Sequence, residues 1–257
     1  MIVPLTVNFG TESFHEGIDI DNDAFFRRLA NEKALPTTSQ PSVGDFVQAF
    51  ERALQQHEQV IGVFLSGRLS GAVRTAETAA RIVGSDIAVI DSNSASYGVA
   101  FPVIEAARMA LEGCTRDEIV ARIQEIVETV EVYFVVDSLE HLHRGGRISS
   151  MQAAIGSLLQ IKPMLTVRDG AIEAFDKVRT RRRALERLFE LIRDAWSANN
   201  HKVRVTIVHA LALAEAESLC ARIRTELHGA DGEIGDVGPV LATHVGPGVI
   251  GAIFYPF

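Results

Sequence analysis

The sequence contains little cysteine and no long apolar run. Only Cys114 and Cys220 occur in 257 residues, and neither belongs to a CxxC pair or to a Cys/His cluster with zinc spacing. A disulfide framework is therefore excluded, and we expect two small buried side chains in a reducing compartment. No stretch approaches the roughly 18 apolar residues of a membrane-spanning helix. The first residues also lack the basic and apolar regions of a signal peptide, so we expect a cytoplasmic protein.

Positive charge is also scarce. The chain has 25 Lys and Arg against 33 Asp and Glu, a formal net charge of −8. A nucleic acid would be repelled at long range by this balance, so no nucleic-acid partner is expected. Apolar residues make up 47% of the chain and charged residues 23%, which is typical of a globular protein. The length fits one large domain or two modest ones.

Short β-branched runs alternate with helical patterns along the chain, which predicts an α/β fold. The runs at residues 60–65, 87–90, 132–136 and 203–208 are typical of strands covered on both faces of a sheet. Ser42 with Asp45 and Thr115 with Glu118 have the spacing of capping boxes and predict two helix starts. The second of these helices is expected to end near residue 130.

The pattern changes near residue 130. Short helices are expected around Leu139 and Met151, and a long helix over about residues 180–196. Asp169-Gly170 between two β-rich runs predicts a hairpin, because glycine supplies the positive φ of a tight turn. We therefore predict a domain at 1–130 with a parallel sheet and a domain at 131–257 with a mixed or antiparallel sheet.

Three polar loops of the first half carry hydroxyls beside helix starts. Two of them, 65–71 and 91–96, follow a strand, and open α/β sheets bind ligands at that end of their strands. Backbone N–H groups and the helix dipole there favour a carboxylate or phosphate. From these residues alone, turn formation and helix capping remain the alternatives. The candidate residues are Thr38 and Ser39 in loop 36–42, Ser66, Ser70 and Gly71 in loop 65–71, and Asp91, Ser92 and Ser94 in loop 91–96.

Two further candidates lie in the second half. Arg147 belongs to an Arg-Gly-Gly-Arg turn, and a guanidinium can bind a carboxylate through two parallel hydrogen bonds. His244 lies in a rigid turn that ends in Gly-Pro-Gly, where a histidine beside a carboxylate would be a tunable donor. A solvated surface turn and a structural histidine remain the alternatives.

Taken in order, these segments resemble the DegV family of bacterial fatty-acid-binding proteins over almost the whole chain. The matching pieces are Thr-Thr-Ser-Gln-Pro-Ser at 37–42, Leu-Ser-Gly at 69–71, Asp-Ser at 91–92 with Ser94 and Ser96, the run 132–139, Arg-Gly-Gly-Arg-Ile-Ser at 144–149, 156–159 with 161–163, Lys-Val-Arg at 177–179, and His244 with 246–248. The resemblance implies two α/β domains with a long-chain fatty acid in a tunnel between them.

The resemblance also implies roles for particular residues. Thr38 and Ser70 match the family's contacts to the fatty acid carboxylate, and Arg147 and His244 match residues at the same polar end. Ser39, Ser66, Gly71 and Ser94 are secondary candidates. By the same likeness the chain is a non-catalytic, monomeric carrier without metal or cofactor. It delivers its fatty acid to a kinase subunit of dihydroxyacetone-kinase type, which phosphorylates the carboxyl group with ATP for phospholipid metabolism.

Residues 177–193 carry seven basic side chains against Glu186 and Glu190. The similar region of the family meets the kinase subunit or, transiently, the membrane surface, where basic side chains are attracted to anionic lipid. Arg179, Arg181 and Arg182 are the docking candidates. A solvated helix face with pairs such as Arg182–Glu186 is the open alternative.

The chain departs from the family in two places. It begins without the usual first strand and its polar turn, so we expect a gap or an unpaired edge in the first sheet. Gly67 and Ala72 stand where the family often has Ser and Thr, which removes two potential hydrogen bonds to the head group. Two rival functions remain: an acyl hydrolase or transferase with His244 as general base toward Ser70, and a degenerate interaction module that binds no lipid.

Overall fold

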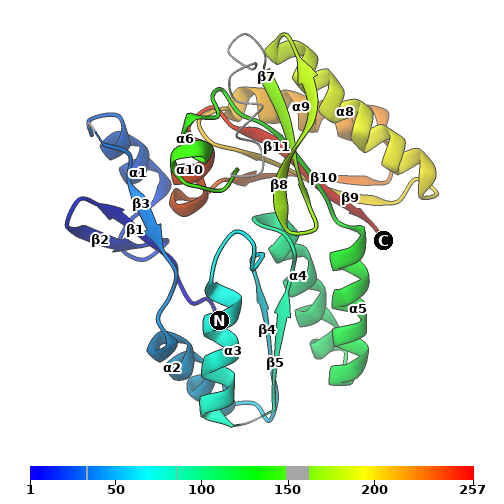
Figure 1. Ribbon diagram of the computed structural model, residues 1–257. Coiled ribbons are helices and arrows are strands. Elements are labelled where there is room, and N and C mark those ends of the chain that lie inside the picture. Colours follow the sequence, from blue (N-terminus) through cyan, green and yellow to red (C-terminus); the bar gives the residue numbers. More distant parts are fainter. Residues whose placement is uncertain (33, 85, 149–161) are drawn as a thin grey trace. The chain divides into compact units, whose positions relative to one another are not determined.

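The computed structural model describes residues 1–32, 34–84, 86–148 and 162–257 (Figure 1). The chain divides into two compact units, one of residues 1–128 with 169–171 and one of residues 129–168 with 172–257. From the sequence we expected the boundary between the two domains to lie between residues 130 and 131. The expected helix around Met151 and the motif pieces between 149 and 161 lie outside the described residues. Both units contain strands and helices, so the α/β class predicted from the sequence is confirmed.

The first unit contains strands and helices in alternation. They are β1 (Thr6–Phe9), β2 (Glu12–His15), α1 (Asn22–Leu29), β3 (Thr37–Ser39), α2 (Val43–Leu54), β4 (Val60–Phe64), α3 (Ala72–Val83), β5 (Ile87–Asp91), α4 (Tyr97–Leu111) and α5 (Arg116–Thr129).

A small antiparallel sheet of order β2-β1-β3 opens the first unit, in addition to the parallel sheet expected there. β1 and β2 form a hairpin around Gly10, which has a φ of +61°. Thr37–Ser39, expected to be loop, forms strand β3 because it pairs with β1, with Thr38 opposite Val7. This strand could not be recognised locally, since three residues of Thr and Ser acquire their structure from a partner about thirty positions earlier.

The parallel pair β4-β5 is the second sheet of this unit, in register from Val60↔Ile87 to Phe64↔Asp91. Phe46 and Phe50 of α2 pack with the alanine face of α3 against Val60 and Phe64 on one side of the pair. Both capping boxes are confirmed. Ser42 and Asp45 satisfy each other's backbone N–H groups at the start of α2. Thr115 and Glu118 do the same at the start of α5.

The second unit is built on one mixed sheet. Its elements are β6 (Glu131–Val135), α6 (Glu140–Arg144), β7 (Lys162–Arg168), β8 (Ala171–Val178), α8 (Arg181–Ala198), β9 (Val203–His209), α9 (Leu213–Glu226), β10 (Ala230–Asp236), α10 (Pro239–Val245) and β11 (Ile250–Pro256). The strand order is β10-β9-β11-β6-β7-β8, in which β9 and β10 are parallel and β11 is antiparallel to both β6 and β9. The mixed sheet predicted for this half is therefore confirmed.

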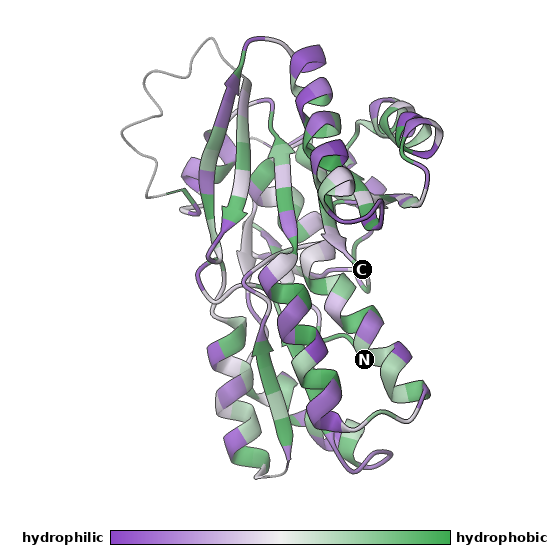
Figure 2. Cartoon of the chain, turned by 90° about the vertical axis from the view of Figure 1, so that its right-hand side faces the viewer, coloured by the Kyte–Doolittle hydropathy of each residue, from purple (hydrophilic) through white to green (hydrophobic). Residues whose placement is uncertain are grey.

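Helices α8 and α9 pack on this sheet and bury its core (Figure 1). Leu188, Phe189 and Ile192 point from α8 toward the strands, and Leu219 and Ile223 do so from α9. Figure 2 shows helices of the chain that carry both hydrophilic and hydrophobic residues, as amphipathic helices with one buried face do. The expected hairpin also forms, because Asp169 and Gly170 between β7 and β8 both have positive φ, 47° and 77°.

Candidate functional site

Loops 65–71 and 91–96 meet at the carboxyl ends of β4 and β5, as the sequence predicted. The backbone N–H of Ser66 donates to the carbonyl of Ser94 at 2.8 Å. The Asp91 carboxylate accepts from the N–H groups of Gly67 at 3.0 Å and Asn93 at 2.8 Å. Asp91 thus joins the two loops, a role that only the paired strands make possible.

The serine hydroxyls of these loops have different uses. Ser66 is fully buried, and its hydroxyl donates to the carbonyl of Gly170 at 2.7 Å and accepts from the N–H of Arg68 at 3.1 Å. It therefore holds the loop in shape. Ser94 is also buried, yet its hydroxyl has no hydrogen-bond partner in the described part of the chain. A buried hydroxyl without a hydrogen-bond partner costs folding free energy. The Ser94 hydroxyl could therefore still donate or accept a hydrogen bond.

Ser70 stands at the start of α3, where its hydroxyl accepts from the N–H of Ala72 at 3.3 Å. Gly71 is the N-cap residue and supplies no side-chain cap, so part of the first turn stays open to an anion. A Cβ at Gly71 would collide with the side-chain amide of Gln40. Gln40 in turn donates to the hydroxyl of Thr75 at 2.6 Å. We did not anticipate Gln40 from the sequence, because its partner lies 35 residues away.

The hydrogen bond from Gln40 to Thr75 positions strand β3. Thr38, two residues before Gln40, is half-buried in the middle of the strand that Gln40 fastens to α3. Ser39 is exposed and accepts from the side-chain amide of Asn8 at 3.0 Å. The structure thus brings the end of β3 beside the first turn of α3, the turn that Ser70 precedes.

In the second unit, Arg147 and His244 belong to one polar cluster between α6 and α10. His141 of α6 contacts the carbonyl of Thr243 in α10 through its Nδ1 at 3.1 Å. Arg147 donates to the carbonyl of Gly145 at 2.5 Å. A Cβ at Gly145 would collide with the ring of His244, so glycine is what permits this close approach. No local sequence pattern predicts a role for His141, because it joins this cluster only through the packing of α6 against α10.

The electrostatics of this cluster keep His244 neutral. Burial lowers its pKa from 6.5 to about 4, and the positive charge of Arg147 and the charge of His141 act in the same direction. Because the folded pKa lies below the unfolded value, protonation favours the unfolded state as pH falls from 6.5 toward 4. At neutral pH the imidazole is a neutral donor or acceptor beside a permanent guanidinium charge.

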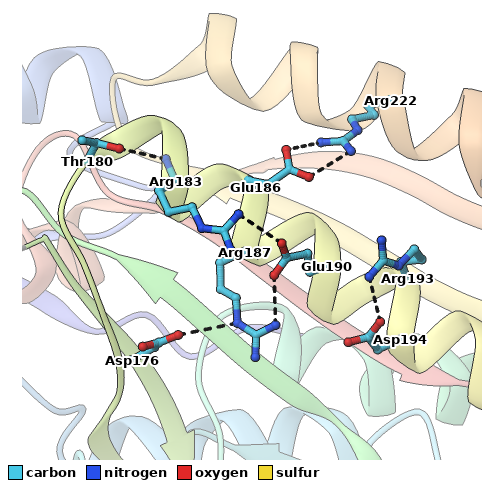
Figure 3. A network of polar contacts seen from close by, with 9 residues as sticks. All are labelled: Asp176, Thr180, Arg183, Glu186, Arg187, Glu190, Arg193, Asp194 and Arg222. Atoms are coloured by element: carbon cyan, nitrogen blue, oxygen red, sulfur yellow. Dashed lines mark hydrogen bonds and ion pairs between the residues drawn. The ribbon is translucent and has the colours of Figure 1, made fainter.

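Most of the basic segment around α8 is paired. In Figure 3, Arg183 and Arg187 both contact Glu190, at 3.3 and 3.1 Å, while Arg187 also approaches Asp176 at 3.6 Å. Arg222 of α9 binds Glu186 through two hydrogen bonds of 2.7 and 3.1 Å. Glu186 thus binds the neighbouring helix and not Arg182, the partner that the alternative of a solvated helix face suggested.

The three docking candidates differ in availability. Arg181 is half-buried and binds the Glu215 carboxylate, with Nη2 to Oε2 at 2.6 Å, so it serves to join α8 to α9. Arg179 and Arg182 are exposed and form no ion pair with any residue that the structure describes. Of the three docking candidates, Arg179 and Arg182 therefore carry positive charges that are not engaged in an ion pair with a described residue.

The rest of the chain adds two observations. No three His, Cys, Asp or Glu side chains within the described ranges gather as a metal site would require. Among the same residues, no helix has the length and apolar character needed to cross a membrane. Cys220 is buried as expected, whereas Cys114 is only half-buried.

Fold and loops together define an α/β protein whose small-molecule site would lie at strand ends and helix starts. The chain belongs to the DegV family: the family model described as "Uncharacterised protein, DegV family" matches residues 1–256. A DegV domain-containing protein of Halalkalibacterium halodurans is 40% identical over 257 residues, which are 99% of this chain and 90% of that protein.

Solved structures have the same fold. The crystal structure of DegV, a fatty acid binding protein from Bacillus subtilis, is similar with a TM-score of 0.93 and 33% identity, over 99% of this chain and 91% of that chain. A stearic acid-binding protein from Eubacterium ventriosum is similar with a TM-score of 0.90 and 26% identity, over 99% and 90% of the two chains. The family resemblance drawn from the sequence motifs is thereby confirmed.

Proposed function

We propose that this chain binds a long-chain fatty acid and presents its carboxylate to a partner kinase. The observation that carries the first part is the likeness, over 99% of the chain, to a Bacillus subtilis protein described as fatty acid binding. A saturated or unsaturated acyl chain would be stabilised by roughly 0.8 kcal/mol for each CH₂ that leaves water. The chain thus acts as a carrier, and the chemistry on the carboxylate belongs to its partner.

In the first unit, Thr38 and Ser70 are the residues proposed to bind the carboxylate. Ser39 and Ser66 already make hydrogen bonds that hold β3 and loop 65–71 in place. Ser70 precedes the start of α3, where Gly71 supplies no side-chain cap and the helix dipole favours a negative charge. Ser94, buried and without a hydrogen-bond partner among the described residues, and Gly71, which leaves room for Gln40, support the same loops.

In the second unit, Arg147 and His244 are proposed to bind the polar end of the ligand. The guanidinium supplies the permanent positive charge, and the neutral imidazole supplies a hydrogen bond. A pKa of about 4 also makes His244 a weak base at neutral pH, which argues against the rival function of an acyl hydrolase. In the proposed sequence of events, the kinase subunit transfers the γ-phosphoryl group of ATP to the carboxylate, which yields an acyl phosphate and ADP.

Native mass spectrometry of the purified chain tests this function. We expect a mass above that of the chain alone, and release of a long-chain fatty acid on denaturation. Thr38→Ala and Ser70→Ala should each lower the affinity for added fatty acid about 10- to 100-fold, because a hydrogen bond to a charged group is worth roughly 1.5–3 kcal/mol.

Thr37→Ala is the matched control, since Thr37 is the exposed neighbour of Thr38 on the same strand. It should bind as the parent does, and all variants should keep the parent's thermal unfolding temperature. Protein that is empty and takes up no added fatty acid would overturn the proposed function. Unchanged affinity in both Thr38→Ala and Ser70→Ala would overturn the head-group assignment alone.

Arg179→Glu tests the docking surface for the kinase subunit. We expect it to leave fatty acid affinity unchanged and to slow acyl phosphate formation by the partner, because charge reversal at an interface rim mainly lowers the association rate. Arg193→Glu is the control, since Arg193 lies on α8, the helix that follows Arg179, and has a half-exposed side chain that is paired to Asp194. Equal rates for Arg179→Glu and the parent, at low and high salt, would contradict a docking role.

A further inference from the structure

The turn between β7 and β8 is partly buried, although the connections between strands usually lie on the protein surface. Gly170 is the buried residue of this turn. The first compact unit includes it together with Asp169 and Ala171, and we call these three residues the hairpin tip. The tip therefore belongs to the unit that carries loops 65–71 and 91–96.

Two hydrogen bonds from loop 65–71 hold the hairpin tip. The hydroxyl of Ser66, which is fully buried, donates to the carbonyl of Gly170 at 2.7 Å. Arg68 donates from its Nη1 to the carbonyl of Asp169 at 3.0 Å. Both acceptors are backbone carbonyls, so these bonds depend on the backbone conformation of the tip rather than on its side chains.

The conformation of the tip requires glycine at position 170 for two reasons. Gly170 has a φ of +77°, which residues with a side chain rarely adopt. A Cβ there would also collide with the hydroxyl of Ser66 and crowd the side-chain oxygen of Asn93. The tip thus lies in close contact with loop 65–71 and with loop 91–96.

Ser66 connects the hairpin tip to Ser70. The carbonyl of Ser66 accepts from the N–H of Ser70 at 3.0 Å and from the N–H of Leu69 at 2.9 Å. The N–H of Ser66 donates to the carbonyl of Ser94 in the other loop. Since Ser66 is bonded to the tip and to both loops, a shift of Ser66 would move the backbone that carries the Ser70 hydroxyl.

The turn itself does not need these bonds. A two-residue turn with positive φ closes a hairpin through its own backbone geometry, without a partner from elsewhere in the chain. Ser66 lies 104 residues from Gly170, and its bond to the tip is buried. The bond therefore stabilises the arrangement of the polar loops in addition to the hairpin.

We propose that the hairpin tip positions Ser70 for the carboxylate of a long-chain fatty acid, with Gly170 and Ser66 as positioning residues that act through Ser70. This inference rests on the proposed function, because it concerns the hydroxyl assigned to the carboxylate. It adds a third segment, distant in sequence, to the two polar loops at the ends of β4 and β5.

Ser66→Ala removes the hydroxyl that binds the tip. In delipidated protein we expect amide exchange at Ser70, followed by NMR, to become at least about tenfold faster. The affinity for palmitate should fall about tenfold, since a displaced binding group loses most of its effect. Thr166→Val is the matched control, because the buried Thr166 hydroxyl donates to the carbonyl of Val132 at 2.8 Å in the second unit. It should exchange and bind as the parent does.

Gly170→Ala introduces the Cβ that collides with Ser66 and should have the same two effects. Gly113→Ala is its control, because Gly113 has a φ of +81° and open space where a Cβ would lie. This control carries the backbone strain of alanine at positive φ without the collision, so it should bind palmitate as the parent does. Circular dichroism should show the same folded state for all four variants.

A double-mutant cycle distinguishes positioning of Ser70 from a general loosening of the first unit. In Ser70→Ala protein, addition of Ser66→Ala should change the palmitate affinity less than about twofold, because the hydroxyl that it positions is already absent. An equal loss in both backgrounds, or unchanged amide exchange at Ser70 in Ser66→Ala, would overturn the proposal. Parent protein that binds no palmitate would instead overturn the proposed function, and the exchange rates alone would then decide whether the tip holds Ser70.

Discussion

Arg147→Met is expected to lower the affinity for a long-chain fatty acid about 10- to 100-fold. The proposed partner of the guanidinium is a carboxylate, and a hydrogen bond to a charged group is worth roughly 1.5–3 kcal/mol. Arg147→Lys should recover only part of this loss, because an ammonium group cannot bind a carboxylate through two parallel hydrogen bonds. The measurement is a fatty acid titration of delipidated protein, followed by native mass spectrometry or calorimetry.

Arg144→Met provides the control for this experiment. Arg144 lies three residues earlier, is 61% exposed in its side chain and pairs with Glu140 at 2.9 Å. It should bind fatty acid as the parent does. A second readout is independent of lipid: Arg147→Met should raise the pKa of His244, since the positive charge of Arg147 helps to hold that pKa near 4. A raised pKa with unchanged affinity would place Arg147 beside His244 but not on the ligand.

Phe46→Ala is expected to lower the free energy of unfolding of the first unit by about 3–5 kcal/mol. Phe46 is 1% exposed, and its ring contacts those of Phe50 and Phe64 at centroid distances of 6.2 and 5.5 Å. Removal of the ring leaves a cavity between α2, α3 and β4 that these elements cannot close. Urea denaturation followed by circular dichroism measures the loss.

Phe257→Ala is the control for this loss. Phe257 is 48% exposed and contacts only the guanidinium of Arg204 among ring partners in the described ranges. Its removal should cost less than about 1 kcal/mol. A loss of similar size for both variants would contradict the view that the first unit depends on the aromatic cluster around Phe46.

Local patterns account for the elements that were predicted correctly. The strands β4, β5, β6 and β9 follow from β-branched runs, and the helix starts at Ser42 and Thr115 follow from capping boxes that act within four residues. The hairpin at Asp169-Gly170 follows from the positive φ of its two turn residues. Each of these signals lies inside a window of a few residues.

Contacts between distant segments account for what was not predicted. Thr37–Ser39 becomes a strand only because β1 offers an edge. Glu186 binds Arg222, 36 positions away, rather than Arg182 on the next turn of its own helix. Arg181 was expected to be available for docking, but it binds Glu215 of the neighbouring helix. No local pattern encodes these pairs, since they depend on which helices lie side by side.

The same division applies to the candidate site. By itself, the sequence determined the family and the α/β class and singled out Thr38, Ser70, Arg147 and His244, because motif order is a property of short segments. Tertiary structure alone decided which hydroxyls hold the loops and that His244 is half-buried and neutral. These properties arise from burial and from hydrogen bonds between distant residues, which exist only once the chain has folded.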